Sequence, residues 1–381
     1  MFVCYTLVVS VRVVKVQLRP PNKGKEQTLR ELQAAYAACA AFHLEGCQRL
    51  ETTNATLLHR ELYGEAKVRF NLPVVMIQRA RDKAIEAQRS YLARKAKGKK
   101  ANPPRFNGHT PLGVGQRSLA IVGSNGKFLL RLSTAEHRAY LWLPIVPDQH
   151  AAPLLSAVAS GSFKHGASEL MERDGSWYLY LTIYEADVPK RDGEVVFGLD
   201  LGIVNHAVLS GPSIVRFWNG RPARNRREYF AERRRELGKA KLLQEIKRSK
   251  GKERRWMHDL NHKLSREIVD TVAENGGTIL HVERLLGIRE RTKTTRKVNR
   301  MMNSWTFREL MTLITHKAAR LGIEVVEVDP RRTSRTCPQC GHAHAGNRPA
   351  QATFNCQKCG YTANADYVAS RNIAAKSMTA G

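Results

Sequence analysis

The sequence VVFGLDLG, residues 195–202, decides how the C-terminal half of the chain is interpreted. It begins as an apolar run without alternation, which is typical of a strand buried on both faces of a sheet, and Asp200 ends that run. The run at 278–283, TILHVE, has the same form and ends in Glu283. The two stretches therefore predict neighbouring buried strands, each carrying a carboxylate at its end.

The segments around these two runs alternate between strand and helix patterns. We predict strands over 205–209, 214–218 and 323–328, and helices over 226–249, 255–274, 304–321 and 365–376. Three strands followed by helices and strands in alternation match the ribonuclease H-like order. This pattern predicts an α/β domain over 191–330, completed by a final helix within 363–381.

The N-terminal half has a different pattern. Residues 1–20 read as strands, and helical spacing of apolar residues follows from Gln27 to Ala96. Between Leu112 and Tyr184, short β-rich runs alternate with turn signals. These features predict a β-barrel or meander over 1–20 and 105–190, interrupted by a helical lobe over 21–104. The chain as a whole is thus expected to be a multidomain α+β protein.

Positive charge is the dominant feature of the composition. The 381 residues include 63 Lys and Arg against 34 Asp and Glu, a formal net charge of +29. Most of it lies in three blocks, 79–105, 216–255 and 284–300. Concentrated basic blocks indicate surfaces for a polyanion, and they argue against a small-molecule metabolic enzyme. With no apolar run near the roughly 20 residues that cross a bilayer, we expect a cytoplasmic, nucleoid-associated prokaryotic protein with no membrane partner.

Four of the seven cysteines form one tight cluster, Cys337, Cys340, Cys356 and Cys359. Two Cys-x-x-Cys pairs can present four thiolates to one tetrahedral zinc ion, with no position left open for a reacting molecule. The spacing therefore predicts a structural zinc ribbon over 331–362. The remaining cysteines, Cys4, Cys39 and Cys47, are expected to be buried thiols.

Three carboxylates are candidates for a second metal site. Asp200 and Glu283 end strands, and Asp366 opens the terminal helix. In a ribonuclease H-like sheet these positions converge, and their hard oxygen ligands favour Mg²⁺ or Mn²⁺. Two such ions can activate a water and stabilise the leaving oxygen of a phosphodiester. Taken singly, Asp200 could belong to a turn, Glu283 to an ion pair, and Asp366 to a helix N-cap.

Two other arrangements of metal-binding residues fit less well. His281-Val282-Glu283 with Cys337 and Cys340 is similar to a zinc deaminase signature, but a proline follows the first cysteine instead of preceding it. His258 and His262 lie one helical turn apart, without the adjacent glutamate of a metalloprotease helix. A structural role is the better interpretation of both histidines.

Five segments, taken in chain order, resemble the TnpB (OrfB) family of insertion-sequence proteins, the compact relatives of type V CRISPR effectors. They are GLDLG (198–202), RRWMHDLNHKLSREIVD (254–270), HVERL (281–285), VDPRRTSRTCPQCG (328–341) and NADYVASRNIA (364–374). The opening KVQLRPPNKGKEQTLRELQAAY (15–36) resembles the N-terminal strand and first helix of that family. Each segment alone is unspecific, whereas their order is specific.

The resemblance implies an RNA-guided DNA endonuclease with a RuvC-like nuclease domain. Asp200, Glu283 and Asp366 would be its catalytic, magnesium-binding triad, and the ribbon would hold one structural zinc. The β-barrel and the helical lobe would hold a guide RNA derived from the end of the element. They would also read a short motif beside the double-stranded DNA target.

Two other functions on the same fold remain open. The first is an RNA-guided repressor with a silent nuclease, which would have no need to keep three carboxylates. The second is an unguided transposase, which predicts strand transfer and activity without bound RNA.

Overall fold

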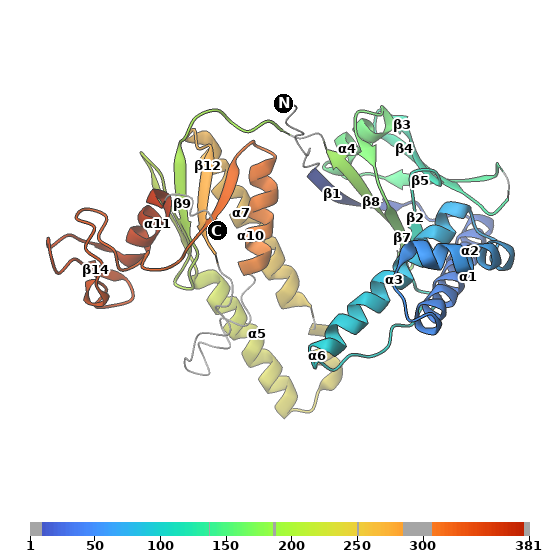
Figure 1. Cartoon of the computed structure of the whole chain (residues 1–381), viewed down its shortest axis with the longest axis horizontal. Coiled ribbons are helices and arrows are strands. Elements are labelled where there is room, and N and C mark those ends of the chain that lie inside the picture. Colours follow the sequence, from blue (N-terminus) through green and yellow to red (C-terminus); the bar gives the residue numbers. More distant parts are fainter. Residues whose placement is uncertain (1–9, 137, 186–187, 250, 285–306, 377–381) are drawn as a thin grey trace. The chain divides into compact units, whose positions relative to one another are not determined.

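The computed structural model describes residues 10–136, 138–185, 188–249, 251–284 and 307–376. The chain divides into two compact units, 1–186 and 187–381, and each is described by itself (Figure 1). Cys4 and nearly all of the basic block 284–300 lie outside the described residues. No helix within the described ranges is long and apolar enough to cross a membrane.

The N-terminal unit is built on an antiparallel sheet. Its strands are β1 (Ser10–Leu18), β2 (Leu112–Val114), β3 (Leu119–Ser124), β4 (Lys127–Ser133), β5 (Tyr140–Val146), β6 (Lys164–His165), β7 (Ser168–Arg173) and β8 (Ser176–Glu185). The hydrogen-bonded order is β2-β7-β8-β1-β5-β4-β3, and β6 pairs with β8. In this order β2 and β3 are the end strands of the described sheet, in the region where the sequence predicted a β-barrel or meander.

Three helices are inserted between the first two strands of this sheet. They are α1 (Lys23–Arg49), α2 (Ala55–Arg69) and α3 (Val74–Ala96), as the helical spacing predicted. The apolar face of α1, including Leu29, Leu32 and Tyr36, shares one core with the inward residues of β1. Cys39 and Cys47 are buried thiols, as expected.

One helix of this unit was not predicted. Residues Ala151–Ala159 form α4, in a region for which the sequence pattern indicated only strands and turns. The Asp148 carboxylate caps the helix by accepting hydrogen bonds from the backbone N–H groups of His150 and Ala151. A short apolar run without periodicity does not distinguish a buried helix from a buried strand, which is why α4 was missed.

The C-terminal unit contains a five-stranded sheet in the order β11-β10-β9-β12-β13. Its strands are β9 (Val196–Asp200), β10 (Asn205–Ser210), β11 (Val215–Asn219), β12 (Ile279–Glu283) and β13 (Glu324–Val328). The first three strands are antiparallel, whereas β9, β12 and β13 are parallel. This agrees with the predicted run of three strands followed by alternating helices and strands.

Helices lie on both faces of this sheet. One face is covered by α7 (Lys252–Glu274) and α10 (Phe307–Ala319), which share a core with Phe197 and Leu199 of β9. The helix α11 (Ala365–Ala375) lies on the opposite face, as Figure 1 shows. The contact between α11 and β9 depends on Gly198, because a Cβ atom there would lie 2.1 Å from the Ser370 carbonyl oxygen.

The long basic helix predicted over 226–249 is two helices. They are α5 (Arg221–Lys239) and α6 (Leu243–Ser249), so a single helix was the wrong prediction. Lys241 lies between them with a positive φ of 55°, which an α-helix cannot contain. The smaller ribbon strands, β14 (Thr353–Asn355) and β15 (Thr362–Asn364), form a separate hairpin before α11.

We expect Gly198→Ala to destabilise the C-terminal unit by roughly 1–3 kcal/mol, because the added methyl group overlaps the α11 backbone. Denaturant unfolding followed by circular dichroism measures the change. Gly238→Ala is the matched control, since Gly238 has open space at its Cβ position. Alanine is the better helix former, so it should raise the free energy of unfolding by about 1 kcal/mol at most. Equal stability of Gly198→Ala and the wild type would contradict this account of how α11 packs.

Candidate active site and cysteine cluster

Two of the predicted carboxylates lie at the same edge of the sheet. The parallel register pairs Leu199 of β9 with Val282 of β12, and Asp200 and Glu283 are the next residues along each strand. Because side chains alternate along a strand, Asp200 points to the same face as Gly198, and Glu283 to the same face as His281. That face carries α11, so both carboxylates lie on the α11 side.

The third carboxylate comes from the first turn of α11. The Asn364 side chain accepts hydrogen bonds from the backbone N–H groups of Asp366 and Tyr367, so Asn364 is the N-cap and the capping interpretation of Asp366 was wrong. The Asp366 carboxylate instead accepts from Asn205 Nδ2 at 2.9 Å and lies 3.4 Å from Arg348 Nη2. The structure thus brings Asp366 to the face that carries Asp200 and Glu283.

The electrostatics show that Glu283 and Asp366 act on Asp200. Burial raises the pKa of Asp200 to about 8, with further contributions from the negative charges of Glu283 and Asp366, while Arg348 opposes the shift. Burial also raises the pKa of Glu283, against a hydrogen bond from Thr333 that lowers it. A bound cation stabilises the ionised forms of carboxylates that burial and repulsion disfavour in this way. Their hard oxygen atoms fit a divalent ion such as Mg²⁺ or Mn²⁺.

Three polar partners of these carboxylates escaped the sequence analysis. Asn205 and Arg348 contact Asp366, and the Thr333 hydroxyl donates to Glu283. Thr333 and Arg348 lie in irregular segments around the ribbon, where no periodicity fixes a side chain's direction. Only Asn205, placed at the start of a strand beside the GLDLG run, had a position that pointed toward the site.

The four predicted cysteines come together in a group that can hold one metal ion. Their sulfur atoms all lie within 4.8 Å of one another. Cys337 Sγ lies 3.6 Å from Cys359 Sγ, and Cys340 Sγ lies 3.6 Å from Cys356 Sγ. Tetrahedral zinc with Zn–S bonds of about 2.3 Å requires sulfur separations of roughly 3.8 Å. The cluster is therefore compatible with one zinc ion and a zinc ribbon.

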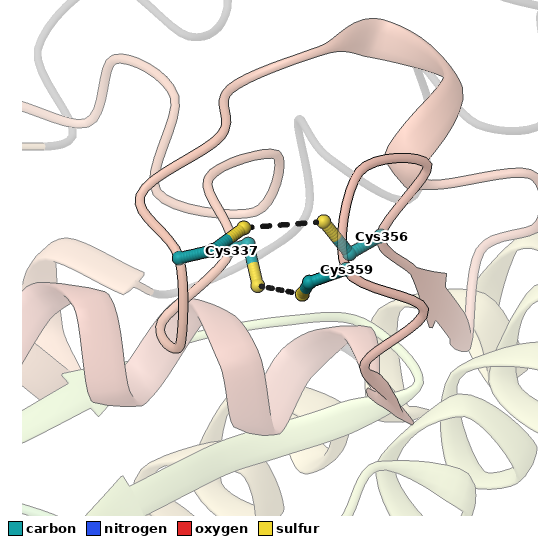
Figure 2. Close-up of side chains that lie close together, drawn as sticks. Cys337, Cys356 and Cys359 are labelled. Carbon is teal, nitrogen blue, oxygen red and sulfur yellow. Dashed lines mark hydrogen bonds between the residues drawn. The ribbon is translucent and has the colours of Figure 1, made fainter.

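Two similar loops present these sulfur atoms to one another, as Figure 2 shows. In each loop a glycine after the second cysteine adopts a positive φ, 72° at Gly341 and 73° at Gly360. The Gly341 N–H donates to the Cys337 carbonyl, and the Gly360 N–H donates to the Cys356 carbonyl. The left-handed conformation turns each loop back on itself, which explains the glycine after each pair.

The histidines that offered alternative metal sites have other partners. His281 is buried beneath α11, with Nδ1 3.2 Å from the Ile373 carbonyl oxygen, so it is not directed at the cysteine cluster. This contact argues against a deaminase-like arrangement. His258 Nδ1 lies 2.7 Å from the Glu309 carboxylate of α10, which agrees with a structural role between α7 and α10.

Comparison with known proteins gives a consistent picture. A family model described as "Probable transposase" (OrfB_IS605) matches residues 179–289, and one described as "Cas12f1-like, TNB domain" matches residues 307–373. The CRISPR-associated endodeoxyribonuclease Cas12f1 of Sulfoacidibacillus thermotolerans is 31% identical over 58% of this chain and 56% of its own length. The TnpB-like protein MJ0751 of Methanocaldococcus jannaschii is 32% identical over 40% of this chain and 57% of its own length. The matches thus span a little over half the length of each relative.

Solved structures show the same fold at low sequence identity. The cryo-EM structure of a Cas12f1–sgRNA–target DNA complex matches with a TM-score of 0.71 and 18% identity. The match covers 92% of this chain and 83% of that chain. The architecture is therefore the mixed α+β, multidomain arrangement of the Cas12 effectors.

Cys340→Ser is expected to reduce bound zinc from about one ion per chain to a small fraction of that, because a hydroxyl is a far poorer zinc ligand than a thiolate. Elemental analysis of the purified protein measures this directly. His342→Ala is the matched control, since His342 lies close to Cys340 in sequence but outside the cysteine group. Zinc retained by Cys340→Ser, or lost from His342→Ala, would show that the ligand set is wrong.

Proposed function

The chain belongs to the TnpB (OrfB) family, relatives of the type V effectors, and from that premise we propose that it is an RNA-guided DNA endonuclease. The observation that carries the proposal is the group formed by Asp200, Glu283 and Asp366 at one sheet edge. Burial disfavours the charged forms of Asp200 and Glu283, and at Asp200 the two neighbouring acids add to this, so the site gains from divalent cations. The relatives named as endodeoxyribonucleases and TnpB-like proteins support the same assignment.

We assign the C-terminal unit as a RuvC-like nuclease domain. Its support is the strand order β11-β10-β9-β12-β13, with the acids of β9 and β12 at the same edge. The ribbon over 331–362 would be an insertion before the final helix, which returns to the sheet with Asp366. In the N-terminal unit, the sheet and the helices α1 to α3 would hold the guide RNA and read a short motif beside the target.

The site residues would divide the work of phosphodiester hydrolysis. Two divalent cations, when bound, would supply an activated water and stabilise the leaving oxygen. Asp200, Glu283 and Asp366 would hold them with carboxylate oxygens, while the amide of Asn205 orients Asp366. Arg348, already beside Asp366, offers a guanidinium that can bind a phosphate oxygen as negative charge accumulates.

The basic surfaces fit a protein that leaves sequence recognition to base pairing. In α5 the exposed residues include Arg226, Arg233, Arg235 and Lys239, and basic side chains continue through α6 into α7. A guided nuclease needs contacts to the nucleic-acid backbone rather than a code for base edges. We propose that this surface lies along the duplex formed by guide RNA and target DNA.

The decisive experiment is cleavage of a plasmid library that carries a guide-matched target beside randomised bases. The protein is expressed with its flanking DNA so that native RNA can load, and the purified complex is assayed with Mg²⁺. We expect guide-dependent cuts that fall by roughly a thousandfold or more in Asp200→Ala, because metal chemistry supplies several kcal/mol of the barrier. Asp259→Asn, an exposed acid of α7, is the control and should cleave normally.

The other outcomes separate the alternatives. Target binding without cleavage, in a complex shown to contain RNA, would favour a nuclease-silent repressor. Strand transfer by RNA-free protein would favour an unguided transposase.

Replacing Arg233, Arg235 and Lys239 together by glutamine should weaken binding of the guide RNA and flatten its salt dependence. Each lost phosphate contact lowers the slope of log K against log salt by about 0.7–0.9. A filter-binding titration between low and physiological salt measures the slope. Glu232→Gln with Glu236→Gln on the same helix is the control, and it should not lower the slope. An unchanged slope in the triple variant would remove α5 from the RNA-binding surface.

A further inference from the structure

The Thr333 side chain is buried beside the acidic site. Thr333 lies in the segment between β13 and the first ribbon cysteine, and only 4% of the residue's surface is exposed. Its hydroxyl donates to Glu283 Oε1 and also lies 3.1 Å from the Pro330 carbonyl oxygen. A hydroxyl has one proton, and an ionised carboxylate is the stronger of the two acceptors. When Glu283 is ionised, the Thr333 hydroxyl therefore donates its hydrogen bond to the Glu283 carboxylate and not to the Pro330 carbonyl.

The backbone around Thr333 is anchored to α11. Asn372 Nδ2 donates to the Thr333 carbonyl at 2.6 Å and to the Thr336 carbonyl at 2.7 Å. Lys376 Nζ donates to the Arg331 carbonyl at 3.0 Å. Because α11 also carries Asp366, one helix fixes both an acid of the site and the loop that contacts a second acid.

A neutral donor suits this position. Glutamate loses considerable rotamer freedom when its carboxylate is fixed, and repulsion from Asp200 would turn a free Glu283 away. Threonine is β-branched and has few χ1 rotamers, so its hydroxyl is held in place by the loop. It binds one lone pair of the carboxylate and adds no charge, which leaves the negative charge and the remaining lone pairs for a cation. A lysine or arginine there would compete with that cation.

On the basis of the proposed function, we infer that Thr333 is a positioning residue of the nuclease site. Its hydroxyl holds the Glu283 carboxylate in the orientation that binds the divalent cation. Through the Asn372 contacts, this orientation is set by α11.

The test compares Thr333→Val, Thr333→Ala and Thr333→Ser with the wild-type protein–RNA complex. Mn²⁺ binding is followed by electron paramagnetic resonance without DNA, and Asp200→Ala gives the background from the RNA. The two variants without a hydroxyl should bind Mn²⁺ at this site about 10–100-fold more weakly, as is usual when a ligand's own hydrogen-bond partner is lost. Serine keeps the hydroxyl and should remain within about threefold of the wild type.

Thr336→Val is the matched control in the same loop. Its hydroxyl donates to the Arg332 carbonyl at 2.9 Å, so its loss should leave Mn²⁺ affinity unchanged. In cleavage assays at saturating target, Thr333→Val should require more Mg²⁺ for half-maximal rate, and excess Mg²⁺ should restore most of the rate. Zinc content of about one ion per chain shows that the ribbon is folded in each variant.

The failures of this inference and of the proposed function are distinguishable. Wild-type Mn²⁺ affinity in Thr333→Val or Thr333→Ala, with zinc retained and with Asp200→Ala inactive, would overturn the role of Thr333 and leave the nuclease intact. An equal loss of affinity in Thr333→Ser and Thr333→Val would also overturn it, because the hydroxyl would then be irrelevant. A wild-type complex that neither binds Mn²⁺ above the Asp200→Ala background nor cleaves would overturn the proposed function itself.

Discussion

The constraint on which the C-terminal unit depends is that three carboxylates lie close together where the adjacent strands β9 and β12 end. Like charges at this distance repel one another. The sheet fixes the backbone of Asp200, because β9 lies between β10 and β12 in the middle of the strand order. Burial and the two neighbouring acids raise its pKa to about 8. A raised carboxylate pKa means stability that is present below the unfolded value near 4 and is lost as pH rises through about 8. A bound divalent cation would offset this loss by stabilising the ionised carboxylates. The same acids that lower the free energy of unfolding at high pH are therefore the candidates for binding metal.

The helix α11 is the element through which this arrangement is assembled. Gly198 allows its backbone to contact β9, and Ser370 and Ser210 make a buried hydroxyl contact between α11 and β10. The close approach brings the first turn of α11, and with it Asp366, to the edge where β9 and β12 end. A larger residue at position 198 would separate the helix from the sheet and would separate Asp366 from the other two acids.

The order of the elements and the three acids followed from local patterns in the sequence. Buried strands such as β9 and β12 are unbroken apolar runs, and a carboxylate at the end of each is visible without a structure. The parts that escaped depend on longer-range packing. The helix α4 is too short to show periodicity, and the break at Lys241 reflects a backbone conformation that no residue type there requires. The contacts of Thr333 and Arg348 depend on where irregular segments cross the sheet edge, which residue spacing does not specify.

The predicted zinc ribbon contains two of the residues whose contacts could not be predicted from the sequence. Thr333 precedes its first cysteine, and Arg348 lies between its two cysteine pairs, yet both side chains reach acids of the site. Asn347 is fully buried between the loops, where its amide donates to the Arg335 and His342 carbonyls and its oxygen accepts from Gln357 N–H. A metal ion that closes the four cysteines fixes the loops on both sides of Asn347. It therefore also restrains the adjacent Arg348, which contacts Asp366. The ribbon thus contributes to the geometry of the acidic site even though all four of its metal ligands lie outside that site.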